Sequence, residues 1–293
     1  MPIWGCNLKE VEFFVASIEN LRVTVNENEA LRNDLLNQGE SYHKTKLFFQ
    51  RYTSFLRYTS KMSGGQFYRV RRAPDAMPYT SRKELIYPDP DPTHKDRMNN
   101  TSFRVLYTSF HEFTAMAECR LSADEVETYF QLTRFSTDKS IAYYKLGMFS
   151  EAHLNSPRDS AEVNEYIKNI LGSDVSDRTV KGFSALECAV ADVLYGEGDD
   201  YHVLSSIMAD AIFTDNPEID AIAYPSVQNR YGMNFAFTQH CADALKIDYS
   251  CLNKLVKVYK NGYFEYRTEQ ECFDFEDLES FDFSAVDMHG SFR

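Results

Sequence analysis

The sequence has few basic residues for its length. Lysine and arginine total 31, aspartate and glutamate total 44, and the formal net charge is -13 with a pI near 5.0. Because neutralising nucleic-acid phosphates needs clustered Lys and Arg, this balance argues against nucleic acid as the main partner. A small anionic molecule needs only a few local arginines, so it is compatible with the charge.

Metal-binding and disulfide motifs are also missing. The six cysteines are scattered, with no CxxC pair and no histidine at zinc spacing, and the seven histidines form no HExxH pair. These spacings do not support a metal site. We therefore expect reduced thiols in a cytoplasmic protein.

Long apolar runs are absent as well. No stretch approaches the ~18 apolar residues of a membrane span, and no N-terminal run resembles a signal peptide, so we expect no membrane association. The composition, 43% hydrophobic and 14% aromatic, excludes general disorder. A chain of 293 residues can form one large domain or two, since domains typically hold ~100–200 residues.

Helical periodicity marks the N-terminal part of the chain. Apolar residues recur at helical spacing from about residue 8 to residue 61, with a break near Gly39. We expect a helical extension here, either packed on the rest of the chain or offered to a partner. Ser63–Gly65 should end it, before a strand at 66–72.

The strand predicted at 66–72 carries Arg69 and Arg71 on one side and Tyr68 and Val70 on the other. One interpretation is an exposed cationic face. The other is that Arg69 binds a phosphate or pyrophosphate through paired hydrogen bonds, which lysine would do less well. The Pro- and Asp-rich stretch 74–92 that follows predicts a long loop, and such loops are more often lids or binding loops than simple connections.

The central stretch 104–120, RVLYTSFHEFTAMAECR, combines a strand and a helix. A β-type run at 103–107 breaks at Thr108–Ser109, and Ser109 with Glu112 has the spacing of a capping box. The periodicity of the helix that follows places Glu118 on its buried face, where a carboxylate must be paired or used. In the other interpretation the helical register differs slightly and Glu118 lies at the solvent border.

Further elements are predicted downstream. A second capping box, Ser184 with Glu187, should open a helix that reaches Tyr195, and Asn261–Gly262 has the composition of a hairpin turn. Pro225 should end a buried strand and place Ser226 at the mouth of that strand. The remaining predictions are strands at 127–135, 141–146, 219–224 and 232–237, helices at 159–171 (closed by Gly172) and 200–213, and an acidic, Phe-containing tail.

Four candidate site residues of different chemistry occur in this order along the chain: Arg69, Tyr107, Glu118 and Ser226. With their surroundings they resemble the RES domain family, named for its Arg, Glu and Ser. The resemblance covers roughly residues 66–237. Its matching segments are FYRVR (67–71), RMN (97–99), LYTS (106–109), TA (114–115) with Glu118, AYPSV (223–227) and GMN (232–234).

This resemblance implies an α+β fold with an ADP-ribosyltransferase-like split β-sheet core and an N-terminal helical extension. We expect the extension at 1–62, a catalytic NAD-binding domain at 63–270 and an acidic tail at 271–293. It also implies that NAD is consumed as a substrate. Many members of the family are toxin-like and degrade NAD by phosphorolysis or hydrolysis. This fold needs no GxGxxG motif, and none occurs.

The resemblance also implies roles for individual residues. Glu118 would bond a ribose hydroxyl and stabilise the oxocarbenium-like state formed when the nicotinamide–ribose bond breaks. Tyr107 would stack on nicotinamide or ribose, and Arg69 would hold the pyrophosphate. Ser226 would bond the nicotinamide end or orient Glu118. Arg97 and Asn99 would assist at the phosphates or the acceptor.

Alternatives stay open at this level. A protein ADP-ribosyltransferase would use the same residues with a side chain as acceptor. A non-catalytic interaction module would act through the helical N-terminus and the acidic tail. Expected partners are NAD, an antitoxin or inhibitor protein, and a second copy of the chain in a homo-oligomer.

Overall fold

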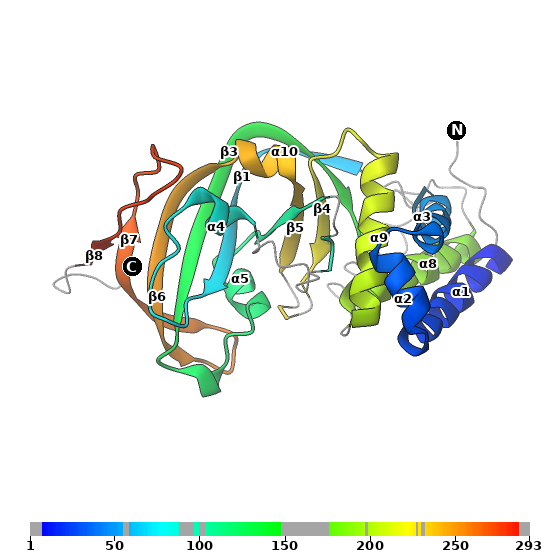
Figure 1. Cartoon of the computed structure of the whole chain (residues 1–293), viewed down its shortest axis with the longest axis horizontal. Coiled ribbons are helices and arrows are strands. Elements are labelled where there is room, and N and C mark those ends of the chain that lie inside the picture. Colours follow the sequence, from blue (N-terminus) through cyan, green and yellow to red (C-terminus); the bar gives the residue numbers. More distant parts are fainter. Residues whose placement is uncertain are drawn as a thin grey trace. The chain divides into compact units, whose positions relative to one another are not determined.

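The computed structural model describes residues 8–54, 59–87, 97–99, 103–147, 176–196, 199–226, 228–229 and 232–286. The chain forms two compact units, each assembled from separate segments (Figure 1). The first unit comprises Met1–Ser60, Asp91–Arg104 and Ala142–Pro225, and the second comprises Lys61–Pro90, Val105–Ile141 and Ser226–Arg293. Each unit therefore contains residues from distant parts of the sequence.

The first unit is mainly helical. Its elements are α1 (Leu8–Glu27), α2 (Glu29–Leu36), α3 (Glu40–Thr53), α8 (Asp177–Tyr195), α9 (Asp199–Asp215), β4 (Ala221–Pro225) and the end of β3 (Tyr129–Lys145). Helix α1 packs on α8, and α3 packs on α9. Val11, Phe14, Ile18 and Val25 are the buried residues of α1, and they recur every three to four residues or at twice that interval, as one buried helical face requires.

Polar contacts also join α3 to α9. The Asp210 carboxylate accepts a hydrogen bond from the Tyr42 hydroxyl at 2.6 Å and pairs with Lys46 at 2.8 Å. Gln50 donates to Asp215 at 2.7 Å. The predicted N-terminal helical segment is thus confirmed and is tied to helices more than 150 positions later in the chain.

The second unit contains most of the strands. They are β1 (Thr59–Arg72), β2 (Val105–Ser109), the first part of β3, β5 (Met233–Thr238), β6 (Lys246–Val258), β7 (Phe264–Cys272) and β8 (Ser284–Ala285). Three short α-helices, α4 (Arg82–Ile86), α5 (Glu112–Glu118) and α10 (Gln239–Ala244), and the 3₁₀ turn η2 (Ala123–Glu125) accompany them.

The strand pairs of the second unit are antiparallel. Strand β2 pairs with β1 and β5, while β3, β6, β7 and β8 pair in sequence. The turn at 259–263 joins β6 to β7, with the Gly262 N–H donating to the Tyr259 carbonyl at 3.0 Å and Gly262 at φ +87°. The hairpin predicted at Asn261–Gly262 is therefore confirmed.

In the first unit, by contrast, the end of β3 pairs in parallel with β4, with Tyr143 opposite Ala221. Parallel and antiparallel pairs together with helices make the chain an α+β protein, as predicted. The structure also contains no helix, within the described residues, that is long and apolar enough to cross a bilayer.

Aromatic and aliphatic side chains fill the described core of the second unit. Phe67 of β1 is fully buried and meets the rings of Phe110, Phe235 and Phe237 edge to face. A second cluster holds α5 against the sheet, and its buried members are Met116, Leu121, Phe130, Leu132, Leu255 and Phe264. The helix that carries Glu118 is thus anchored by apolar packing on β3, β6 and β7.

Several boundaries differ from the predictions. Helix α3 ends at Thr53, and Ser63–Gly65 lies inside β1 instead of before it. Gly64 has φ +71°, and a Cβ there would stand 2.6 Å from the Thr137 carbonyl oxygen. The glycine therefore serves a close approach of two backbones within a continuous strand, which local sequence cannot distinguish from a break.

Other corrections have tertiary causes too. The strands predicted at 127–135 and 141–146 form one long strand, β3, because β6 pairs with its first half and β4 with its end. Ser184 and Glu187 lie inside α8, so they are not a capping box. The stretch predicted as a loop includes α4, which Ser81 and Glu84 cap. The helix predicted at 159–171 lies outside the described residues.

Candidate functional site

Glu118 is the last residue of α5. This helix begins after His111, whose side chain makes no capping hydrogen bond. The predicted capping box of Ser109 and Glu112 is therefore wrong, because Ser109 belongs to β2, where it pairs with Asn234 of β5. Pairing of two strands has overridden the local capping preference.

The Glu118 carboxylate is held by two donors. Its Oε1 accepts a hydrogen bond from the Ser226 hydroxyl at 2.5 Å and another from the Asn234 side-chain amide at 2.8 Å. Hydrogen bonds to a charged acceptor are stronger than those between neutral groups. The two bonds to Glu118 therefore fix the orientation of its carboxylate. The structure thus brings together Glu118 and Ser226, 108 positions apart.

A second layer of polar residues supports these donors. The Asn234 Oδ1 accepts from the Ser109 hydroxyl at 2.7 Å, and both residues are at most 3% exposed. The Ser226 Oγ accepts from the Asn229 backbone N–H at 2.9 Å, and the Asn229 side chain donates to Thr114 at 2.8 Å. We call these residues, with Glu118, the carboxylate network.

The turn after Ser226 closes on Gly232. The Ser226 N–H donates to the Gly232 carbonyl at 2.8 Å. A Cβ at Gly232 would stand 2.4 Å from the Thr114 methyl carbon and 3.1 Å from the Ser226 Cβ. Only a residue without a side chain fits here, so Gly232 permits α5 and the Ser226 turn to come into contact.

Tyr107 lies on the same face of the sheet as this network. It is two residues before Ser109 on β2, and side chains two apart on a strand point to the same face. Its cross-strand partner is Ala236, next to Asn234 on that face. Ala236 has a small side chain, and Tyr107 is half-buried.

Arg69 is positioned differently. Tyr68 pairs with Ser109, so strand alternation directs Arg69 to the other face of β1. Its guanidinium donates a short hydrogen bond to the Ile86 carbonyl in α4. Burial raises the pKa of the Cys119 thiol at the end of α5, and the charge of Arg69 is one of the smaller effects that oppose this rise.

Arg97 and Asn99 belong to the first unit. The Arg97 guanidinium donates to the Leu194 carbonyl in α8 at 3.3 Å, and Asn99 is buried. Their roles toward phosphates or the acceptor stay predictions.

The sequence interpretation missed Asn234 and Ser109 as parts of the site. A signal was present, because Asn234 stands in a strand whose neighbours Phe235, Ala236 and Phe237 are apolar. A buried amide in such a strand requires a hydrogen-bond partner. The identity of that partner, Glu118, was not predictable from the strand itself.

Burial also affects titratable groups around α5. Burial raises the pKa of Glu112, although its hydrogen bond to Tyr266 opposes the shift. Burial raises the pKa of the Cys119 thiol, and the charges of Arg72 and Arg69 oppose that shift. Burial therefore makes ionisation of the Glu112 carboxyl less favourable at the first turn of α5, while the cationic Arg72 lies at the end of the helix.

A separate groove of about 860 Å³ lies in the first unit between α1 and α8. Val11, Val15, Ile18, Ala189 and Val193 contribute to its apolar lining, with acidic residues among them. It contains none of the predicted site residues.

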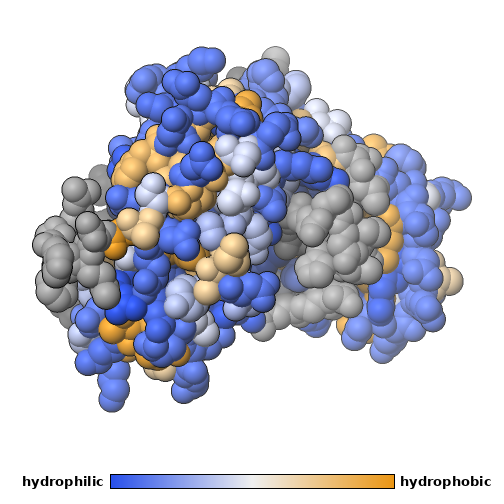
Figure 2. Space-filling view, turned by 60° about the vertical axis from the view of Figure 1, so that its left-hand side comes forward, coloured by the Kyte–Doolittle hydropathy of each residue, from blue (hydrophilic) through white to orange (hydrophobic). Residues whose placement is uncertain are grey.

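On the face that Figure 2 shows, hydrophobic residues gather in patches among hydrophilic ones. Among the described residues, no group of three or more His, Cys, Asp and Glu could hold a metal ion.

Comparison with known families identifies the class of protein. The RES domain model matches residues 66–253, which is more than half of the chain. The chain therefore belongs to the RES domain family. No curated protein and no solved structure matches it. At family level the RES domain indicates an NAD-related, ADP-ribosyltransferase-like or toxin-associated role.

Proposed function

We propose that this protein degrades NAD by cleaving the bond between nicotinamide and ribose. The observation that carries the proposal is the Glu118 carboxylate, oriented by Ser226 and Asn234 within a RES domain. A carboxylate so held can stabilise positive charge on a ribose ring, because it needs little reorganisation when that charge develops.

In the proposed reaction the C1′–N bond breaks and its electron pair leaves with nicotinamide, which becomes neutral. The developing charge on the ribose is oxocarbenium-like, as in glycoside cleavage. An oxygen of phosphate or of water then bonds to C1′, and a water acceptor releases a proton. The products are nicotinamide and either ADP-ribose 1″-phosphate or ADP-ribose.

Each residue would have a defined part. Glu118 accepts a hydrogen bond from a ribose hydroxyl and faces the developing charge. Ser226 and Asn234 donate to the Glu118 carboxylate and keep it oriented. Tyr107 offers a phenol face to nicotinamide or ribose. Arg69, whose planar guanidinium suits a pyrophosphate, would bind it if the side chain leaves the Ile86 carbonyl or shares its donors with it, and if the pyrophosphate extends to the face of β1 opposite Tyr68.

The test is NAD consumption by the purified full-length protein, with and without phosphate. Glu118→Gln keeps the size of the side chain and removes its charge, so we expect kcat to fall at least ~100-fold. Glu276→Gln, at an exposed position, is the matched control and should retain wild-type turnover. Equal inertness of wild type and Glu118→Gln, with NAD and phosphate supplied, would refute the proposal.

The fate of the ADP-ribose separates the two enzymatic alternatives. With adenine-labelled NAD, label in small molecules supports phosphorolysis or hydrolysis. Label on protein instead would make the chain a protein ADP-ribosyltransferase. The phosphate dependence of the rate then distinguishes phosphorolysis from hydrolysis.

A further inference from the structure

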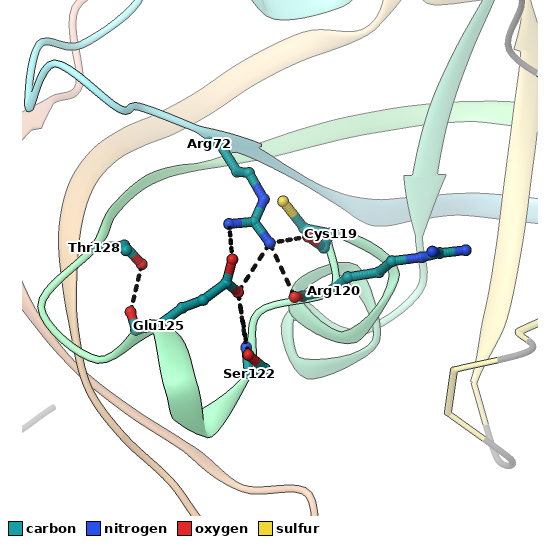
Figure 3. A network of polar contacts seen from close by, with 6 residues as sticks. All are labelled: Arg72, Cys119, Arg120, Ser122, Glu125 and Thr128. Carbon is teal, nitrogen blue, oxygen red and sulfur yellow. Dashed lines mark hydrogen bonds and ion pairs between the residues drawn. The ribbon is translucent and has the colours of Figure 1, made fainter.

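Arg72, the last residue of β1, holds the end of the helix that carries Glu118. Its Nη2 donates to the carbonyl oxygens of Arg120 at 2.9 Å and Cys119 at 3.2 Å. The same guanidinium forms a two-point ion pair with the Glu125 carboxylate, at 2.6 and 2.9 Å (Figure 3). We call these contacts the Arg72 clamp.

The turn that the clamp holds is strained. Arg120 has φ +54°, a left-handed conformation that is unfavourable for a residue with a Cβ. The turn has the hydrogen bonds of a Schellman ending, from the Arg120 N–H to the Ala117 carbonyl at 2.8 Å and from the Leu121 N–H to the Met116 carbonyl at 3.3 Å. The turn therefore needs external support, and Arg72 supplies donors to its two outward carbonyls.

Glu125 is itself fixed in place. The Ser122 N–H and hydroxyl donate to its Oε2 at 3.2 and 3.3 Å, within the 3₁₀ turn that follows α5. The hydrogen bond from Arg72 lowers the pKa of Glu125, so the carboxylate is charged at neutral pH. Figure 3 shows the Arg72 guanidinium between Glu125 and the turn, with the Arg120 side chain directed away from it.

We propose that Arg72 and Glu125 are positioning residues for Glu118. By fixing the turn directly after Glu118, the clamp sets the direction in which that carboxylate meets Ser226 and Asn234. This inference rests on the proposed cleavage of NAD. Strand β1 would then position two parts of the site, because it carries both Arg69 and Arg72.

If Arg72 and Glu125 formed only an ordinary surface ion pair, its loss would leave kcat unchanged. The side chains of Arg72 and Glu125 are 42% and 32% exposed, and exposed pairs add little to stability. A positioning role, by contrast, lowers turnover with little change in stability or substrate binding, since small misplacements of a catalytic group are costly.

The experiment compares Arg72→Gln, Glu125→Gln and the double variant. We expect kcat for NAD cleavage to fall about tenfold with KM within about twofold and Tm nearly unchanged. Because Glu125 acts through Arg72, the double variant should be no slower than Arg72→Gln. The matched control is Arg267→Gln, whose side chain is 50% exposed and forms an ion pair with Glu269.

Hydrogen exchange gives a readout independent of catalysis. In Arg72→Gln, but not in Arg267→Gln, the amides of Arg120 and Leu121 should exchange faster, because the turn has lost its support. Unchanged exchange would overturn the clamp, and faster exchange with unchanged kcat would overturn the positioning role. If the wild-type protein cleaves no NAD, the proposed function fails and the positioning role with it, while the exchange data still decide whether Arg72 holds the turn.

Discussion

Gly232 offers a direct test of the contact between α5 and the Ser226 turn. In Gly232→Ala the new Cβ would stand 2.4 Å from the Thr114 methyl carbon and 2.6 Å from its hydroxyl oxygen. An ordinary contact begins near 3.4 Å, so the overlap is about 1 Å. Thr114 is fully buried, and therefore it cannot move aside into solvent.

The loss of stability in Gly232→Ala depends on how the overlap is relieved. Either Thr114 moves and strains its hydrogen bond with Asn229, or the turn moves and withdraws Ser226 from Glu118. Overpacking of a well-packed interior typically costs about 1–3 kcal/mol. In a chain of this size that corresponds to a fall in Tm of several degrees.

The assay is thermal unfolding of four proteins: wild type, Gly232→Ala, Thr114→Ala and the double variant. Thr114→Ala removes the two atoms closest to the new Cβ, so the double variant should be about as stable as Thr114→Ala alone. The expected coupling between the two positions is roughly 1–3 kcal/mol. Additive effects, or a Gly232→Ala variant as stable as wild type, would refute the packing described for this turn.

Three further predictions concern single positions. Asn234→Asp places a second carboxylate beside Glu118, so Tm should fall strongly at pH 7 and recover toward pH 4, whereas a uniform fall would contradict this. Glu112 has a raised pKa in the folded state, so its stabilising contribution is full below its unfolded pKa of about 4.5 and declines as pH rises through the folded pKa. Glu112→Gln should therefore raise the urea midpoint at pH 7 and have little effect at pH 4. Gly64→Ala should lower Tm by several degrees, because Gly64 has φ +71° and its Cβ would overlap the Thr137 carbonyl oxygen.

Much of the local structure was predictable because it depends on periodicity and turn chemistry. The N-terminal helices follow from apolar residues at helical spacing, and the buried strand before Ser226 follows from its apolar run and Pro225. The Asn261–Gly262 hairpin follows from residues that tolerate a positive φ. These signals are local, so they act without knowledge of the rest of the chain.

The predictions that failed share one physical reason. Ser109 with Glu112 and Ser184 with Glu187 both have capping-box spacing, but the first serine lies in a paired strand and the second inside a longer helix. Likewise, Ser63–Gly65 has the composition of a break yet belongs to β1. Long-range pairing and packing outweigh a capping preference that is worth only about 1 kcal/mol.

The sequence by itself determined the family and the class of fold, and it indicated Glu118 and Ser226 as candidate residues, because these depend on short motifs and on the order of apolar segments. Only the tertiary structure decided that Asn234 and Ser226 both donate to Glu118, and that Arg72 supports the turn after it. Those contacts join segments far apart in the chain, and their geometry depends on strand register, which no local pattern specifies.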